Sequence, residues 1–302
     1  MDVAGAAGIA LGAAADLAFG DPRRGHPVAG FGRAAAALER VTWRDSRTAG
    51  ALHWAALVLP LAAVPTPRHP LARTAATALA TWAVLGGTSL GRAGTRMAEL
   101  LDDLPAARAH LPTLAGRDPS TLGEAELVRA TVESVAENTS DAAVAPLVWG
   151  AVAGVPGLLA YRAVNTLDAM VGYRSPRYAR FGWASARADD VANWVPARLT
   201  AALTVAVAPL VGGSASGARR TWRRDGGAHP SPNSGRCEAA AAGALGLQLG
   251  GTNVYGSRVE HRPTMGEGRA PERADVDRAV ALSRAVWTAA AALAVTARLL
   301  RR

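Results

Sequence analysis

Six long apolar stretches alternate with polar segments along the chain, at residues 3–20, 49–66, 71–90, 142–164, 197–213 and 280–300. Each is close to the ~20 residues that an α-helix needs to cross the hydrocarbon core of a membrane. Many of their residues are Ala or Gly, and small side chains let membrane helices pack closely. The pattern predicts an all-α, polytopic membrane helical bundle with Ala/Gly-rich spans. A soluble, all-helical protein with Ala-rich buried helices is the alternative.

The stretch at 142–164 is interrupted in its middle by Gly-Val-Pro-Gly at 154–157. An interrupted helix at membrane depth is stable only when it is buried in protein or lines a polar cavity. Arg clusters flank several of the six stretches. Simple alternation of six spans cannot place all of these clusters on the cytoplasmic side, where positive charge normally accumulates. We therefore expect a broken or re-entrant helix near 142–164.

The segment from 101 to 126 differs from its surroundings because it is mixed in charge and contains three prolines. This composition is typical of short helices and turns. We expect a soluble excursion at about 92–130 within a single integral-membrane domain that covers residues 1–302.

Composition supports a membrane protein and narrows its chemistry. Half of the residues are hydrophobic and 19% are charged, below the roughly 25% that is typical of soluble domains. The net charge is +9, and no residue is Lys. The absence of Lys excludes a Walker-type phosphate loop and a Schiff-base enzyme. The single cysteine, Cys237, excludes an internal disulfide and a Cys-cluster metal site. No nucleic-acid-binding motif accompanies the basic charge, so anionic lipid or an anionic substrate is the expected partner.

Short polar blocks adjoin the apolar stretches, and the first covers residues 133–141. On a helix Glu133, Glu137 and Asp141 share one face. Like charges at this spacing repel, so a bound cation or Arg must offset them. Mg²⁺ held by one or two carboxylates and by substrate phosphates fits this need. The structural alternative is a helix start capped by Thr139, Ser140 or Asp141.

Two further blocks, at 161–174 and 183–198, combine carboxylates with amides at helical spacing. Ionisable residues beside a membrane span are costly and usually functional. The alternative is a structural network of hydrogen bonds and ion pairs between helices. The residues concerned are Arg162, Asn165, Asp168, Arg174, Arg187, Asp189, Asp190 and Asn193.

The fourth block, at 229–238, places Ser and Asn at the start of an Ala-rich helix beside Arg236. Exposed backbone donors and an Arg fork suit a phosphate group, whereas an ordinary capped turn is the alternative. Similar polar turns lie at 20–27 and 250–256. We expect these polar inter-helix loops to form one composite site. Their candidate residues are Arg23, His26, His229, Asn233, Arg236 and Asn253.

Six strings in this order carry a resemblance to a known family. They are Gly-Asp-Pro-Arg-Arg-Gly-His-Pro at 20–27, Glu-Asn-Thr-Ser-Asp at 137–141, Tyr-Arg-Ala-Val-Asn-Thr-Leu-Asp-Ala-Met-Val-Gly-Tyr-Arg at 161–174, Ala-Asp-Asp-Val-Ala-Asn-Trp-Val-Pro-Ala-Arg at 188–198, His-Pro-Ser-Pro-Asn-Ser-Gly at 229–235 and Gly-Gly-Thr-Asn-Val-Tyr-Gly at 250–256. The chain resembles the adenosylcobinamide-phosphate synthase family of cobalamin biosynthesis, the CobD/CbiB family. The resemblance covers about residues 10–268.

The resemblance implies a multi-pass cell-membrane ligase that depends on ATP and Mg²⁺. Such an enzyme joins adenosylcobyric acid to aminopropanol, or to aminopropanol O-phosphate, through an amide bond. It also implies assembly with other late cobalamin enzymes. A corrinoid transporter or a membrane scaffold for cobalamin assembly is the main alternative, although no internal repeat supports a transporter. A membrane prenyl- or phosphotransferase is a further alternative.

Amide formation explains why acids and arginines would gather in such a protein. A carboxylate resists attack by an amine, so it must first become an acyl phosphate or a similar activated species. That step needs a metal and Arg to neutralise phosphate, and a base to keep the amine unprotonated. The predicted catalytic residues are Glu137, Asp141, Asp168 and Asp190. The predicted metal ligands are Glu133, Glu137, Asp141, Asp168 and Asp189. The predicted substrate-binding residues are Arg23, His26, Asn138, Arg162, Asn165, Arg174, Arg187, Asn193, His229, Asn233, Arg236 and Asn253.

Overall fold

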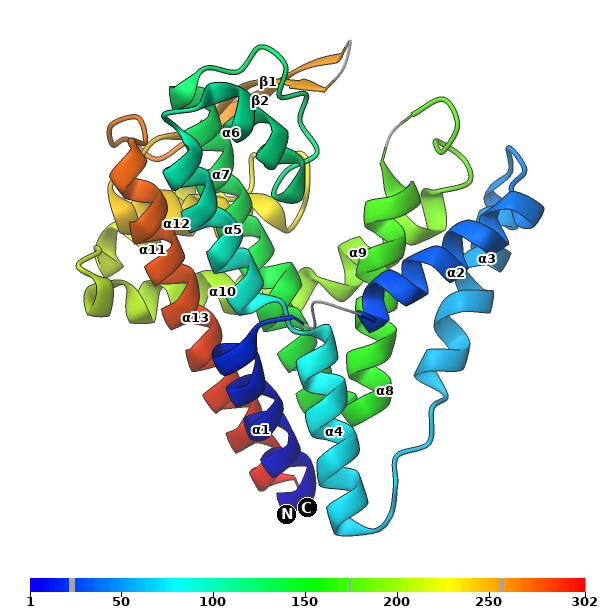
Figure 1. The fold of residues 1–302 in the computed structure, drawn as a ribbon. Helices are drawn as coiled ribbons and strands as arrows, with labels where there is room; N and C mark the ends of the chain where they lie inside the picture. The colour runs from blue at the N-terminus through cyan, green and yellow to red at the C-terminus, as the bar shows by residue number, and fades with distance from the viewer. Residues whose placement is uncertain (22–24, 174, 256–257, 302) are drawn as a thin grey trace. The chain divides into compact units, whose positions relative to one another are not determined.

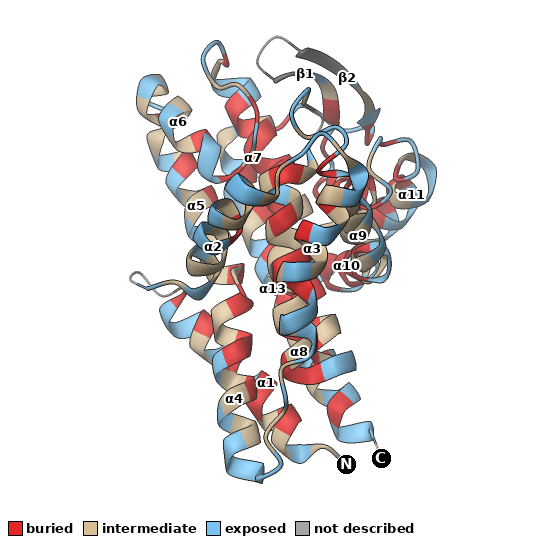
Figure 2. Ribbon diagram, turned by 90° about the vertical axis from the view of Figure 1, so that its right-hand side faces the viewer, coloured by how far each residue is buried: buried red, intermediate tan, exposed pale blue. Residues whose placement is uncertain are grey.

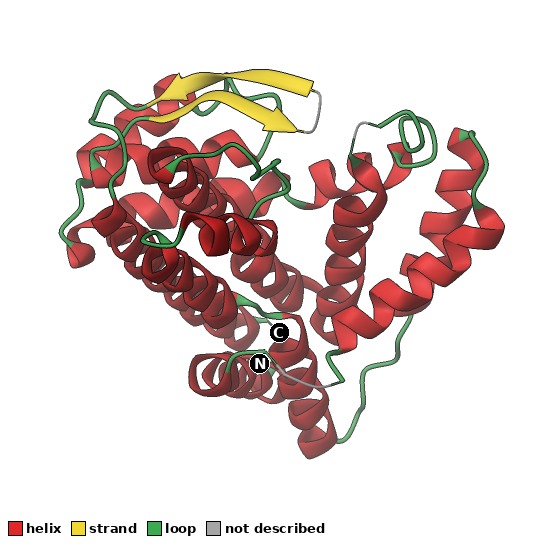
Figure 3. Ribbon diagram, turned by 45° about the horizontal axis from the view of Figure 1, so that its top comes forward, coloured by secondary structure: helices red, strands yellow, loops and turns green. Residues whose placement is uncertain are grey.

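The computed structural model describes residues 1–21, 25–173, 175–255 and 258–301, without the side chains of 253–255 and 258–260. Most of the described residues are helical, and two of the described segments pair as one antiparallel two-stranded sheet (Figures 1 and 3). By contacts between its residues the chain divides into two compact units. Unit 1 comprises Met1–Gly86, Ala145–Trp194 and Ala291–Arg302, and unit 2 comprises Gly87–Val144 and Val195–Ala290.

Unit 1 is entirely helical in its described residues. Its elements are α1 (Val3–Phe19), α2 (Pro27–Thr42), α3 (Arg47–Ala62), α4 (Pro70–Val84), α8 (Ala145–Leu167), η3 (Asp168–Gly172), α9 (Trp183–Ala192) and the last turns of α13 (Arg273–Leu300). Helices α1 and α4 lie side by side (Figure 1). A Cβ atom at Gly8 or Gly12 of α1 would come within 2.5 Å of the Cβ atoms of Thr77 or Thr81. The small residues of α1 therefore permit this close approach.

Helix α8 is broken at Gly154, which has φ 68° and ψ −143°. Only glycine adopts this region of φ and ψ without strain. The break brings Gly150 against Leu158, and a Cβ atom at Gly157 would overlap the carbonyl oxygen of Trp149. A straight helix would separate residues eight positions apart by about 12 Å. The two arms of α8 therefore fold back on each other, which confirms the predicted broken helix near 142–164.

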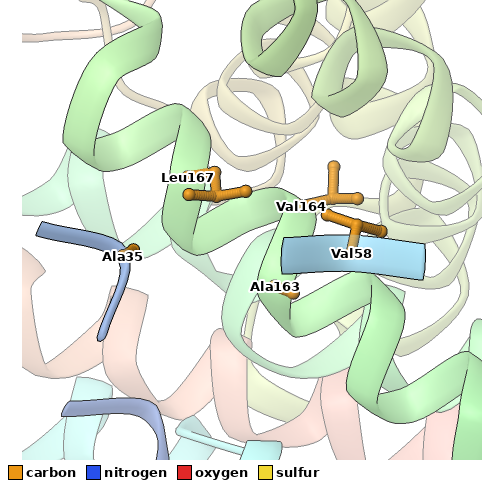
Figure 4. Close-up of a cluster of buried hydrophobic side chains, with 5 residues drawn as sticks. All are labelled: Ala35, Val58, Ala163, Val164 and Leu167. Carbon is orange, nitrogen blue, oxygen red and sulfur yellow. The ribbon is translucent and has the colours of Figure 1, made fainter. Parts of the chain in front are cut away.

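The second arm of α8 supplies most of an apolar cluster in unit 1. Ala163, Val164 and Leu167 are buried there with Ala35 of α2 and Val58 of α3 (Figure 4). Because the apolar positions of this arm face α2 and α3, its polar positions are left for other contacts. The cluster thus fixes the helix that carries the second polar block.

Unit 2 surrounds α7, along which most residues are buried (Figure 2). The elements of unit 2 are α5 (Gly87–Leu100), α6 (Leu104–His110), η1 (Leu111–Thr113), α7 (Glu124–Thr139), η2 (Ser140–Val144), α10 (Trp194–Val207), η4 (Ala208–Val211), α11 (Ala215–Asp225), α12 (Ser234–Leu245), β1 (Leu249–Tyr255), β2 (Arg258–Met265) and the greater part of α13. The Ala-rich helix α12 is almost wholly buried and packs against α11 and α7.

Three helical stretches are long and apolar enough to cross a membrane. Within the described residues they are Glu124–Gly172, Trp194–Val211 and Arg273–Leu300. They overlap three of the six predicted stretches. Most of each of the other three lies in a shorter helix, of 17, 16 and 15 residues in α1, α3 and α4. The all-α membrane bundle predicted from the sequence is confirmed.

Candidate functional site

The predicted site residues fall into two groups, one in each unit. Unit 2 holds Glu133, Glu137, Asn138, Asp141, His229, Asn233 and Arg236, and unit 1 holds His26, Arg162, Asn165, Asp168, Arg187, Asp189, Asp190 and Asn193. Arg23 and Arg174 lie outside the described residues, as does the side chain of Asn253. That all of them form one composite site stays a prediction.

In unit 2 the start of α12 is joined to α7 by a side-chain hydrogen bond. Ser234 donates from Oγ to Oε1 of Glu137 at 2.5 Å. The loop before α12 is shaped by its own bonds, because Ser231 Oγ accepts from the backbone N–H groups of Asn233 and Ser234. The backbone N–H of Ser231 in turn donates to Nδ1 of His229 at 3.0 Å. The string at 229–235 therefore meets the string at 137–141.

One turn earlier on α7, Glu133 holds a second motif in place. Its carboxylate is 2% exposed and forms an ion pair with Arg117, which is 8% exposed. The other oxygen accepts the backbone N–H of Gly250 at 2.7 Å. Arg129 donates to the carbonyl oxygens of Gly250 and Thr252. The Gly-rich turn at the start of β1 is thus tied to α7. As a metal ligand, Glu133 would have to exchange one of these partners.

Glu238 is an acid whose importance the sequence analysis missed. It lies on α12 four residues after Ser234, is fully buried, and neither of its oxygens has a hydrogen-bond partner among the described residues. Its Oε1 lies 3.8 Å from Nε2 of His229. Burial, reinforced by the charges of Glu137 and Glu133, raises the pKa of the Glu238 carboxyl. The sequence offered one signal for Glu238. It follows Ser234 by four residues, and positions i and i+4 of a helix share a face.

The remaining unit 2 candidates surround this contact. Arg198 donates to Oδ1 of Asn233 at 3.5 Å, and the guanidinium of Arg236 lies close enough to interact electrostatically with that of Arg198. The amide of Asn138 bonds back to Ser134 of its own helix. These contacts place two cations beside the first turn of α12.

Cys237 is a packed thiol rather than an exposed one. Its sulfur lies 3.7 Å from the carbonyl oxygen of Ala197, and the residue is 2% exposed. Burial raises the pKa of the thiol. Because the thiolate is the nucleophilic form, a raised pKa makes Cys237 a poor nucleophile.

In unit 1 a chain of hydrogen bonds joins α8 to α9. Arg162 donates to Oδ1 of Asn165 at 3.3 Å, and the amide of Asn165 donates to Oδ1 of Asp189 at 3.3 Å. Arg162 also binds the carbonyl oxygen of Val84 at the end of α4. The structure therefore brings together a cation, an amide and a carboxylate from two of the predicted blocks.

The other unit 1 candidates flank this chain. Asn193 ends α9 and accepts from the hydroxyl of Tyr161 at 2.8 Å. Asp190 lies 3.4 Å from Arg187, and its partial burial raises the pKa of its carboxyl despite that cation. His26 caps the start of α2, since its Nδ1 accepts the N–H of Val28.

Two of the predicted catalytic acids lie in π-helical turns. Asp141 is in η2, which continues α7, and Asp168 begins η3, which continues α8. The side chain of Asp168 folds over Gly172 at the end of its turn. Turns of the π type are rare and occur frequently at functional sites. The widened turns support a functional role for these two positions.

No complete metal-binding cluster is preformed in the part of the chain that the structure describes. There, no three His, Cys, Asp or Glu side chains are placed to hold a metal ion together. Mg²⁺ commonly binds through only one or two carboxylates together with substrate phosphates. The predicted Mg²⁺ site therefore stays a prediction.

Membrane-length helices with polar sequence strings at their ends define a helical membrane protein that carries polar sites. A family model described as CobD/Cbib protein matches residues 9–283, and the chain belongs to this family. The family resemblance inferred from the sequence is confirmed.

The curated relatives are similar over most of their length. The chain is 58% identical to the cobalamin biosynthesis protein CobD of Mycobacterium tuberculosis strain H37Rv, over 96% of this chain and 95% of the relative. It is 49% identical to that of Geobacter metallireducens, over 83% of both chains. It is 42% identical to that of Stutzerimonas stutzeri, over 90% of both chains. No solved structure matches. These names support a role in cobalamin biosynthesis.

Proposed function

We propose that the chain is the ligase that joins adenosylcobyric acid to aminopropanol, or to aminopropanol O-phosphate, through an amide bond. The product is adenosylcobinamide or its phosphate. The observation that carries the proposal is the hydrogen bond between Glu137 and Ser234. It unites two strings of the family type in one cluster that contains both acids and arginines. Amide ligation of a carboxylate at the expense of a nucleotide needs both kinds of side chain.

Bound ATP and Mg²⁺ would supply the phosphoryl group and the positive charge that activate the corrinoid carboxylate. The residues present fit these groups. Glu137 and Asp141, one helical turn apart on the α7–η2 segment, offer the oxygen donors that Mg²⁺ prefers. Arg198 and Arg236, beside the start of α12, carry planar guanidinium groups that match phosphate or carboxylate oxygens.

The unit 1 group has the same chemical character. Asp168 and Asp189 offer carboxylate oxygens, Arg162 offers a cation, and Asn165 connects Arg162 to Asp189. We assign this group to holding a phosphate or carboxylate group of a substrate. Asp190 remains in the catalytic set because a carboxylate with a raised pKa is a stronger proton acceptor.

The test uses purified protein in detergent with adenosylcobyric acid, aminopropanol phosphate, ATP and Mg²⁺. Mass spectrometry should detect a product heavier by the amine less one water, and omission of ATP or of Mg²⁺ should abolish it. Alanine at Asp141, Asp168 and Asp190 should reduce product formation. The control is Asp45→Ala, which removes an exposed acid that pairs with Arg180. Full ligation by all three variants would overturn the residue assignment.

A corrinoid transporter or membrane scaffold is the competing function. The broken helix α8 is the feature that favours it, because transporters use interrupted helices at their binding sites. Corrinoid binding without any amide product would decide for this alternative.

The proposed partners also include the lipid bilayer and other late cobalamin enzymes.

A further inference from the structure

Glu238 is a buried acid that is not among the residues assigned to the ligase reaction. It is fully buried on α12, and both of its carboxylate oxygens lack a hydrogen-bond partner among the described residues. A buried charge without a partner is expensive, and burial of the neutral acid without hydrogen bonds is costly too. Such a group is maintained at a cost in stability, which a ligand that binds both oxygens would offset.

The tautomer of the neighbouring His229 can be derived from its contacts. Nδ1 accepts the backbone N–H of Ser231 at 3.0 Å, so a neutral His229 carries its proton on Nε2. That nitrogen lies 3.8 Å from Oε1 of Glu238, which is too far for a hydrogen bond. His229 therefore directs an N–H toward the carboxyl of Glu238. It forms no hydrogen bond with either carboxyl oxygen.

Both carboxylates and guanidinium groups act on Glu238. Glu133 and Glu137 of α7 raise the cost of its ionised form, while Arg117 and Arg262 lower it. Arg117 is already paired with Glu133, and one oxygen of Glu137 accepts a hydrogen bond from Ser234. Neither arginine donates a hydrogen bond to Glu238. A small cation that carries N–H groups would supply both a positive charge and the missing donors.

We propose that Glu238 binds the amino group of the amine substrate, at the start of α12 beside His229. The inference rests on the proposed ligase function, which supplies a small substrate with one primary amine. An ammonium group has three N–H donors and one positive charge, enough to satisfy both oxygens of Glu238.

The same contact prepares the amine for reaction. Without a cation, burial favours the protonated form of Glu238 because it raises the pKa of the carboxyl. A bound ammonium ion replaces that proton as the positive charge. When the amine has to act as a nucleophile, one N–H bond breaks, the proton moves to a Glu238 oxygen, and the electron pair stays on nitrogen. A carboxylate with a raised pKa accepts this proton more readily than an ordinary one.

Glu238 is closed off from solvent, so an amine reaches it only when residues packed around it move. His229 is one such neighbour. Its side chain packs against Gly235 in the first turn of α12, and Ser231 of the same loop bonds to Ser234.

The experiment compares Glu238→Gln with the wild type over pH 6.5–9.5 in the ligation assay. The variant keeps the shape of the side chain and cannot accept a proton. We expect a KM for the amine raised about tenfold and a kcat/KM lowered about 100-fold at pH 7, the scale of one general base. The deficit should shrink toward pH 9.5, where free amine is abundant in solution. A merely structural role would lower activity equally at every pH.

The control variant is Glu267→Gln, which removes an exposed glutamate of the same unit and should match the wild type. An unchanged KM for the amine in Glu238→Gln, with active wild-type protein, would overturn the proposal. Binding is measured separately as the increase in Tm on adding 1-amino-2-propanol. The wild type should be stabilised, and Glu238→Gln should not, whether or not ligation occurs. If Glu238→Gln does not fold, Glu238→Asp is compared instead. Its shorter acid is displaced from the amine, so the KM for the amine should rise, and an unchanged KM would overturn the proposal.

Discussion

Ser234 of α12 donates a hydrogen bond to Glu137 of α7 at 2.5 Å, although 97 positions of sequence separate them. The bond aligns the first turn of α12 with the acidic face of α7. It also leaves the second oxygen of Glu137 for a ligand. The proposed ligase chemistry depends on this alignment because it sets the acids of α7 beside the arginines that flank α12.

Ser234→Ala removes this bond. A hydrogen bond to a charged group contributes about 1.5–3 kcal/mol, so kcat/KM for ligation should fall about 10- to 100-fold if the alignment serves the reaction. Steady-state kinetics measure the change. The matched control is Ser216→Ala on α11, whose hydroxyl contacts only the exposed Ser214 among the described residues. Equal activity of the two variants would show that the Glu137–Ser234 bond is not needed.

Glu133→Gln should destabilise unit 2 more than the same substitution at an exposed glutamate. The substitution leaves the buried Arg117 without its carboxylate and weakens the bond from Gly250. Breaking a buried ion pair costs about 3–5 kcal/mol. Thermal unfolding in detergent should show a clearly lower Tm. Glu99→Gln, which breaks an exposed pair with Arg96, should cost at most about 1 kcal/mol. Similar Tm values for the two variants would contradict the role given to Glu133.

Gly154→Ala tests the broken helix. At this position φ is positive, and a Cβ atom would come within 2.6 Å of a guanidinium nitrogen of Arg298. Strain of this type costs about 1–3 kcal/mol, and the variant should unfold at a lower temperature. Gly116→Ala is the control, because a Cβ atom there meets nothing within 4 Å. A continuous helix through residue 154 would instead tolerate alanine well.

Asp225 gives a dependence of stability on pH. The hydrogen bond that Asp225 accepts from Arg224 lowers the pKa of its carboxyl in the folded state. A second hydrogen bond, from the backbone N–H of Gly266, lowers it further. The resulting stability is complete above the ordinary pKa of 3.8 and is lost as the pH falls through the lower folded-state pKa. Tm measured from pH 6 to pH 3 should therefore fall more for the wild type than for Asp225→Asn. Parallel curves would exclude this contribution.

The sequence predicted the break in α8 because Gly and Pro in an apolar run have direct backbone consequences. Helix ends were less predictable. The apolar stretch at 71–90 continues past Val84, yet α4 ends there because Leu85 adopts an extended conformation with ψ 147°. The next helix begins at Gly87. Hydropathy alone does not detect a change of direction between two apolar segments.

The site was predictable in its residue types but not in its pairings. Helical spacing placed Glu133, Glu137 and Asp141 on one face. It could not show that Arg117 neutralises Glu133, or that Glu238 lies beside His229, because tertiary packing brings these partners together. The π-helical turns at Asp141 and Asp168 have no simple sequence signal either.

The most direct test of the ligase follows one oxygen atom. Adenosylcobyric acid labelled with ¹⁸O in its free carboxylate is incubated with the protein, the amine, ATP and Mg²⁺. If the carboxylate is activated by ATP before the amine attacks, each amide formed transfers one ¹⁸O to the phosphate-containing product of ATP. Mass spectrometry of that product should detect the label in step with amide formation. Amide formation without transfer of label, or a corrinoid that stays unchanged, would contradict the proposed function.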